Sequence, residues 1–255
     1  MLPDPVPSPG PGLVPDPGQA FDPTRPVTLA ADETPRGSVA LRRRSLDPAG
    51  AGEVYELITN GTFVMDTLET TTERLLAQAA LVYAPAGAAW SVVVGGLGLG
   101  FTVRELLADA RVARVDVIEL EPAVVGWVRD GLVPPTAGIL ADERVHAHVA
   151  DVRGWLPTLP AGSTDAILLD VDNGPDFLVH RANTEVYERP FLGVVRRALR
   201  PGGVVAVWSA TRSTALRRRL EREFGSCEEI HRVVPREGRR LDYYLYASRA
   251  DRTGA

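Results

Sequence analysis

Apolar runs alternate with amphipathic segments along residues 91–209, in the order and spacing of strands followed by helices. The strand-like runs are SVVVGG, RVDVIEL, RVHAHVA, DAILLDV and GGVVAVWS. The segments between them with helical character are FTVRELLADA, EPAVVGWVRDGL, a short VRGWLPTL and NTEVYERPFLGVVRRALRPGG. Because the strands are continuously apolar, they predict an α/β fold, in which helices cover both faces of a mostly parallel sheet.

The last apolar segment, CEEIHRVVPREGRRLDYYLYAS, departs from this rhythm. It contains two strand-like runs on either side of Glu237-Gly238, with no helix between them. Strands joined by a short turn pair antiparallel, so the sheet is expected to close with an antiparallel hairpin. The α/β domain is predicted to span residues 69–249, followed by a short C-terminal tail at 250–255.

A small β element is predicted ahead of this domain, at residues 37–68. VALRRRS and EVYELI have strand-like content, and Asn60-Gly61 separates two alternating runs. Asn-Gly is the strongest two-residue hairpin signal, because both turn positions need a positive φ. A helix is then expected to begin in TTTERLLAQAALVY, where Thr70 and Glu73 have the spacing of a capping box.

Residues 1–36 contain ten prolines. Proline fixes φ and removes a hydrogen-bond donor, and this stretch has few apolar side chains to offset the entropy of ordering. The composition predicts a disordered or polyproline tail.

The overall composition narrows the function class. The 255 residues carry a net charge of -5, which argues against nucleic acid or an anionic membrane as a partner. A single cysteine, Cys227, excludes an intrachain disulfide framework. With no long apolar run and no signal-peptide pattern at the N-terminus, we expect a soluble, cytoplasmic protein.

The first strand of the α/β domain ends in a glycine-rich turn formed by Gly95, Gly96, Gly98 and Gly100. In open α/β sheets a ligand binds at this place, where glycines let the backbone approach it closely. The dinucleotide pattern G-x-G-x-x-G fails, because counting from Gly96 puts Phe101 at the sixth position. The spacing that remains, Gly96-x-Gly98-x-Gly100, is usual in folds that bind S-adenosylmethionine, although a tight turn without a ligand would use the same residues.

Two acidic residues follow the next two strands. Glu119 ends the second strand, where a carboxylate can accept both ribose hydroxyls; alternatively it is a solvated acid at a strand end. Asp151 follows the third strand and is placed to accept from an adenine amino group, or to cap the short helix after it. A glycine turn and two acids after three successive strands together predict an adenosine-containing ligand.

The fourth strand ends in LLDVDNGPDF, where Asp170, Asp172 and Asn173 cluster. These residue types also form turns. A carboxylate at the edge of an apolar strand is nevertheless a candidate for orienting or deprotonating a nucleophile, and Asp170 holds that position. His146 and His148 have no acidic or cysteine partner at ligand spacing, so no metal is expected.

From about Val39 to Ser248, the order of elements resembles the spermidine synthase-like branch of the class I methyltransferase fold, a Rossmann-like fold. FVMDTLETTTER resembles the end of the β domain, VVVGGLGLG the glycine turn, VIELEPAVV the ribose segment, HVADVRGWL the adenine segment and DAILLDVDNGPD the catalytic loop. The resemblance implies a sulfonium nucleoside donor, a small-molecule amine acceptor and a homodimer. It implies that the donor is bound by Gly95, Gly96, Gly98, Gly100, Glu119, Leu120, Asp151 and Val152.

The resemblance leaves the reaction open. Aminopropyltransferases of this family carry acids where this chain has Gly98 and Asn173, and the helix TERLLAQAAL lacks the aromatic and acidic positions usual at a polyamine site. We therefore expect methyl transfer from S-adenosylmethionine ahead of aminopropyl transfer from its decarboxylated form. Asp170 is the expected catalytic residue, with Asp172 and Asn173 at the acceptor. Tyr187, on the helix that follows, either lines the acceptor pocket or is a core aromatic. An inactive nucleoside-binding module is the alternative from another class.

Overall fold

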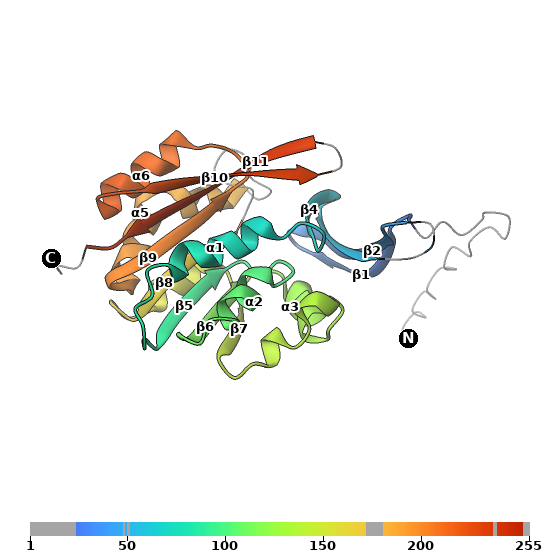
Figure 1. The fold of residues 1–255 in the computed structure, drawn as a ribbon, viewed down its shortest axis with the longest axis horizontal. Coiled ribbons are helices and arrows are strands. Elements are labelled where there is room, and N and C mark those ends of the chain that lie inside the picture. The colour runs from blue at the N-terminus through green and yellow to red at the C-terminus, as the bar shows by residue number, and fades with distance from the viewer. Residues whose placement is uncertain (1–23, 48, 50–51, 172–180, 237–238, 252–255) are drawn as a thin grey trace, which may run out of the picture.

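A computed structural model describes residues 24–251 of the chain, apart from 48, 50–51, 172–180 and 237–238. In this part of the chain a four-stranded sheet at the N-terminus lies beyond the carboxyl ends of the parallel strands of a larger, seven-stranded sheet that carries the helices (Figure 1). None of the described helices combines the length and hydropathy needed to cross a bilayer.

The N-terminal sheet has the order β1-β2-β3-β4, and every neighbouring pair is antiparallel. Its strands are β1 (Val27–Thr34), β2 (Gly37–Ser45), β3 (Glu53–Thr59) and β4 (Thr62–Asp66). Asn60 and Gly61 join β3 to β4 with φ of 51° and 72°. The predicted Asn-Gly hairpin is confirmed.

The predicted tail is wrong over its last ten residues, because residues 27–34 form β1. This strand pairs with β2 along its length, and Pro35 and Arg36 form the turn between them. Most β1 side chains are exposed, so its order comes from backbone pairing and not from apolar burial. A pattern search for buried side chains cannot detect such a strand. Residues 1–23 lie outside the described part.

The larger sheet has the order β10-β11-β9-β8-β5-β6-β7, and the five strands β5 to β9 run parallel. The strands are β5 (Trp90–Gly95), β6 (Val112–Glu119), β7 (Val145–Val149), β8 (Thr164–Leu169), β9 (Leu199–Ser209), β10 (Glu228–Arg236) and β11 (Arg239–Arg249). The predicted parallel sheet and its antiparallel closing hairpin are both confirmed. The strand order reverses at β5, which lies between β6 and β8, and such a reversal opens a crevice for a ligand.

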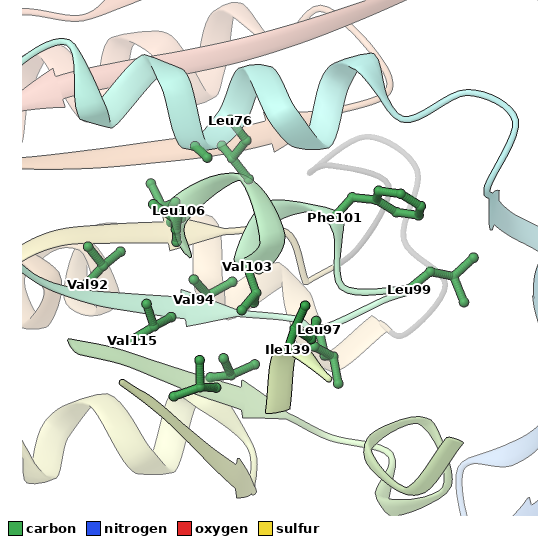
Figure 2. Close-up of a cluster of buried hydrophobic side chains, with 14 of the residues drawn as sticks. Leu76, Val92, Val94, Leu97, Leu99, Phe101, Val103, Leu106, Val115 and Ile139 are labelled. Atoms are coloured by element: carbon green, nitrogen blue, oxygen red, sulfur yellow. The ribbon is translucent and has the colours of Figure 1, made fainter. Parts of the chain in front are cut away.

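Helices cover both faces of this sheet. One face carries α1 (Thr71–Leu81), α2 (Phe101–Leu107) and α3 (Pro122–Arg129), and Figure 2 shows Leu76 of α1 lying over Val92, Val94 and Leu106. The opposite face carries α4 (Val152–Trp155), α5 (Arg189–Ala198) and α6 (Thr214–Phe224). Short 3-10 turns lie at Pro134–Thr136, Ile139–Ala141, Leu156–Thr158 and Arg181–Tyr187.

Two local features differ from the sequence predictions. Helix α1 begins at Thr71, but the Thr70 side chain makes no capping hydrogen bond, so the predicted capping box does not form. The Glu73 carboxylate instead accepts from the Thr72 hydroxyl at 3.0 Å. Helix α6 was not among the predicted helices, because its few apolar positions are separated by a run of arginines.

One buried ion pair joins the N-terminal sheet to the C-terminal hairpin. Arg236 at the end of β10 donates to Asp66 at the end of β4, and the Asp66 side chain is 0% exposed. The Arg236 guanidinium also lies over the Phe63 ring, 4.2 Å from its centroid. Asp66 accepts two further bonds, from the backbone amides of Leu68 and Glu69, at 3.0 and 3.1 Å.

We expect Arg236→Gln to lower the free energy of unfolding by about 3 kcal/mol, because it leaves the buried Asp66 charge without its cation. Chemical denaturation measures the change. Arg232→Gln, at an exposed position of the same strand, is the control and should change little. Equal losses in the two variants would show that the ion pair does not hold the sheets together.

Candidate functional site

A pocket opens where the carboxyl ends of β5, β6 and β8 meet the N-terminal sheet. The larger sheet supplies its polar lining, including Gly96, Glu119 and Asp170. Val39, Leu57 and Met65 of the N-terminal sheet form the opposing apolar wall. The pocket therefore lies at the strand-order reversal, where the sequence pattern predicted the ligand.

Gly96 brings the ends of β5 and β8 into direct backbone contact. It has a φ of +93°, and a Cβ at this position would lie 2.0 Å from the carbonyl oxygen of Asp170. The Asp170 amide in turn donates to the carbonyl of Gly95 at 2.8 Å. Only glycine permits this approach, which fixes Asp170 at the pocket floor.

The other three glycines have different roles. A Cβ on Gly98, which lines the pocket, would lie 2.7 Å from the sulfur of Met65, and that sulfur accepts from the Leu99 amide at 3.3 Å. Met65 therefore fills the space beside Gly98. Gly95 and Gly100 are not among the lining residues; Gly100 starts α2 with a φ of +89°.

Glu119 is held by the backbone around it. Its two carboxylate oxygens accept from the amides of Leu97 and Glu121, each at 2.8 Å. Burial raises the pKa of this carboxyl group, and the backbone hydrogen bonds oppose the rise. Each oxygen keeps a further lone pair for a ligand hydroxyl, so the geometry fits a ribose diol.

Asp151 serves both roles that the sequence left open. Its side chain caps α4 by accepting from the Arg153 amide at 2.9 Å, and it also lines the pocket. The Arg153 guanidinium, at 2.6 Å from one carboxylate oxygen, lowers the pKa of Asp151 together with that amide bond. Leu120 and Val152, the neighbours of the two nucleoside acids, line the same pocket.

Arg36, in the turn between β1 and β2, joins the N-terminal sheet to the end of the pocket that contains Glu121 and Asp151. Its guanidinium donates to both carboxylate oxygens of Glu121, at 2.7 and 3.0 Å, and to the carbonyl of Leu120 at 3.1 Å. Glu121 is 9% exposed and lines the pocket. Both Glu121 and Asp151 are therefore neutralised by an arginine.

The opposite end of the pocket holds carboxyl groups without a cation. Burial raises the pKa of Asp170 to about 8, and the nearby Glu73 and Glu119 carboxylates add to the rise. Burial likewise raises the pKa of Glu73 to about 7. Among the described residues, no side chain donates a hydrogen bond to the Asp170 carboxyl group, so the group is available to a ligand.

Of the three residues predicted at the acceptor, the structure describes only Tyr187, which does not line the pocket. Asp172 and Asn173 lie outside the described residues. Tyr187 is 2% exposed and packs with Phe191 and Leu192 in the core under α5. That core lies on the face of the sheet opposite α1, so of the two interpretations of Tyr187 the structure agrees with the core aromatic.

Sequence reasoning missed Glu73 and Trp208 as pocket residues. Glu73 was assigned to a capping box, and the segment that forms α1 was interpreted as lacking the aromatic and acidic positions usual at a polyamine site. A signal for both was available, since α1 directly follows the β element and Trp208 is the next-to-last residue of the strand beside Asp170. The carboxyl ends of neighbouring parallel strands converge, so a large side chain there lies near the ligand.

Comparison with known proteins agrees with this geometry. A sequence model of the spermine/spermidine synthase domain matches residues 71–224, which is more than half of the chain. The chain belongs to the spermine/spermidine synthase family. The predicted resemblance to this family is confirmed, as is the fold class.

Curated relatives match over the pocket-bearing part. Spermidine synthase 1 from Hyoscyamus niger is 35% identical over 117 residues, 45% of this chain and 34% of that protein. Putrescine N-methyltransferase 3 from Nicotiana tabacum is 34% identical over 116 residues, 45% of this chain and 28% of that protein. The matched segment thus spans about a third or less of these relatives' length.

A solved structure extends the likeness to the whole fold. Spermidine synthase from Thermotoga maritima superposes with a TM-score of 0.71 over 89% of this chain and 74% of that chain, at 15% sequence identity. At this identity the superposition shows a shared fold, including the small β sheet ahead of the α/β domain.

We expect Glu119→Gln to weaken binding of methylthioadenosine by about tenfold or more, because the ribose loses a hydrogen bond to a charged acceptor. Calorimetric titration measures the dissociation constant, with the exposed Glu143→Gln as the matched control. Unchanged affinity would mean that the ribose is held elsewhere.

Asp170→Asn should stabilise the unliganded protein at alkaline pH. The folded-state pKa of about 8 lies above the unfolded value, so ionising Asp170 destabilises the fold progressively between about pH 4 and pH 8. Asparagine carries no such penalty. The melting temperature of the variant should match that of the parent at pH 4 and exceed it at pH 9. The exposed Asp130→Asn is the control, and its melting temperature should show no such gain at pH 9.

Proposed function

We propose that this chain is an aminopropyltransferase that moves the aminopropyl group of decarboxylated S-adenosylmethionine to a small amine. The observation that carries the proposal is the charge of the pocket lining. Five lining residues bear carboxyl groups, Glu73, Glu119, Glu121, Asp151 and Asp170, and among the described lining residues none is Arg, Lys or His.

This charge distribution favours the decarboxylated donor. S-adenosylmethionine carries a carboxylate on its amino-acid arm, and beside Glu73 and Asp170 the described lining offers that carboxylate no cation to pair with. The decarboxylated arm ends in an ammonium group alone, which those carboxylates attract. The adenosine end fits too, since Glu119 presents two oxygens to the ribose and Gly96 leaves room for close approach.

The proposed step is an in-line displacement. The acceptor nitrogen attacks the carbon beside the sulfonium; the new C–N bond forms as the C–S bond breaks, and sulfur leaves with the electron pair as neutral methylthioadenosine. Asp170 accepts the proton that the nitrogen loses. Its pKa of about 8 lies near neutral pH, where a general base is most effective.

Methyl transfer is the second candidate. The sequence favoured it because Gly98 stands in the glycine turn where aminopropyltransferases carry an acid. The match to putrescine N-methyltransferase keeps it open. The family match and the spermidine synthase relatives support aminopropyl transfer better, and Glu73 supplies an acid that the sequence comparison did not count. The order of the two hypotheses is therefore reversed from the sequence prediction.

The test offers each donor with a panel of amines and identifies the nucleoside product. Methylthioadenosine formed from the decarboxylated donor supports the proposal. S-adenosylhomocysteine formed from S-adenosylmethionine, with no methylthioadenosine from the other donor, would establish methyl transfer instead.

In the same assay, Asp170→Asn should lower kcat by about 10²–10⁴, the range for loss of a general base. Binding of methylthioadenosine should change by less than about twofold, because Glu119 and the glycine turn hold the nucleoside. Exposed Asp130→Asn is again the control. Full turnover in Asp170→Asn would remove this residue from the chemistry.

A further inference from the structure

One peptide group connects the N-terminal sheet to the acid that faces the ribose. Its carbonyl, that of Leu120, accepts from the Arg36 guanidinium at 3.1 Å. Its amide, that of Glu121, donates to Glu119 Oε1 at 2.8 Å. A trans peptide group is planar, so its C=O and N–H point in opposite directions and turn together. Holding the carbonyl therefore also fixes the direction of the N–H that orients the Glu119 carboxylate.

The Arg36 guanidinium binds this segment at a second point. Its Nε and Nη2 donate to the two carboxylate oxygens of Glu121, at 2.7 and 3.0 Å. Arginine provides this fork geometry and lysine does not. The Glu121 side chain is 12% exposed, so water competes little for its carboxylate. Arg36 is not among the residues that line the pocket, so it affects a ligand through the residues that it holds.

The turn that carries Arg36 is itself braced by a second turn. Asn60, in the β3–β4 hairpin, donates to the Arg36 carbonyl at 3.3 Å and accepts from the Ser38 amide at 3.0 Å. Gly37 has a φ of +116°, and a Cβ there would overlap Asn60 Oδ1. The Arg36 amide donates to the Thr34 hydroxyl at 3.2 Å. Both hairpins of the N-terminal sheet therefore set the position of the guanidinium.

Resting on the proposed function, we propose that Arg36 is a positioning residue that sets how strongly the site selects ribose over 2′-deoxyribose in the nucleoside it binds. With Arg36 in place, Glu119 is held with a free lone pair on each oxygen toward the two ribose hydroxyls. Without Arg36 the Leu120–Glu121 peptide group can turn, and the carboxylate is no longer preorganised for both hydroxyls. An ion pair that only attached the N-terminal sheet would affect the two nucleosides equally.

Calorimetric titration with methylthioadenosine and with its 2′-deoxy analogue gives the ratio of the two dissociation constants. The unaltered protein should prefer methylthioadenosine by about tenfold or more, the effect expected when a charged acceptor loses its partner hydroxyl. Arg36→Gln should reduce this preference by about threefold or more, as expected within one hydrogen-bond network. Arg43→Gln, which removes an exposed ion pair with Glu53 in the same sheet, is the matched control and should leave the preference unchanged.

Arg36→Lys separates position from charge. It keeps a positive charge beside Glu121 and with it the attachment of the sheet, but an ammonium group does not hold the carboxylate and the carbonyl in a fixed plane. The preference for ribose should fall in this variant too, while its melting temperature stays close to that of the unaltered protein. In a Glu119→Gln background, where the ribose acid is already lost, Arg36→Gln should reduce the preference no further.

The outcomes separate the two proposals. The inference is overturned by equal affinity for the two nucleosides in the unaltered protein, by an unchanged preference in Arg36→Gln, or by full preference in Arg36→Lys. A further fall in the Glu119→Gln background would also overturn it, because Arg36 would then act through another group. None of these results counts against aminopropyl transfer, which the panel of donors and amines decides. A protein that binds neither nucleoside would count against both proposals.

Discussion

The pocket depends on keeping carboxyl groups close together in a poorly hydrated place without a cation beside them. Asp170, Glu73 and Glu119 each have a raised pKa for this reason. The arrangement is unfavourable in the unliganded protein. It persists because the surrounding structure fixes the positions of these side chains. Gly96 presses against the backbone of Asp170, and backbone amides hold Glu119 from two sides. A cationic ligand removes the repulsion between the carboxyl groups. The free energy that this repulsion costs the unliganded fold therefore contributes to ligand binding.

The two ends of the pocket separate two tasks by charge. At the nucleoside end, Arg36 and Arg153 neutralise Glu121 and Asp151, which leaves hydrogen-bonding geometry as the main determinant. At the other end the carboxyl groups are unpaired, so attraction for positive charge dominates. A neutral adenosine and a cationic arm thus find different environments within one cavity.

Much of the fold and of the nucleoside site could be predicted from local sequence. Continuous apolar strands, Asn60-Gly61 and the glycine turn each specify structure through a few neighbouring residues, and the structure agrees with them. Strand β1 was missed because it is ordered by pairing and has little buried surface. Glu73 was missed because its role is set by Asp170, ninety-seven positions away, and helical spacing alone favoured a cap. Tyr187 was left between the acceptor pocket and the core, because nothing local shows which face of the sheet a residue after a loop will reach.

The ion pair between Asp66 and Arg236 also bears on how the chain acquires its structure. The two residues are 170 positions apart, and the wall of the pocket that contains Met65 is anchored through that bond. During synthesis the N-terminal hairpins emerge first, yet Asp66 has no cation to pair with until β10 has left the ribosome. Closure of such a distant contact raises the contact order and slows folding. The ion pair that anchors this wall of the pocket therefore forms only once the C-terminal hairpin has been synthesised.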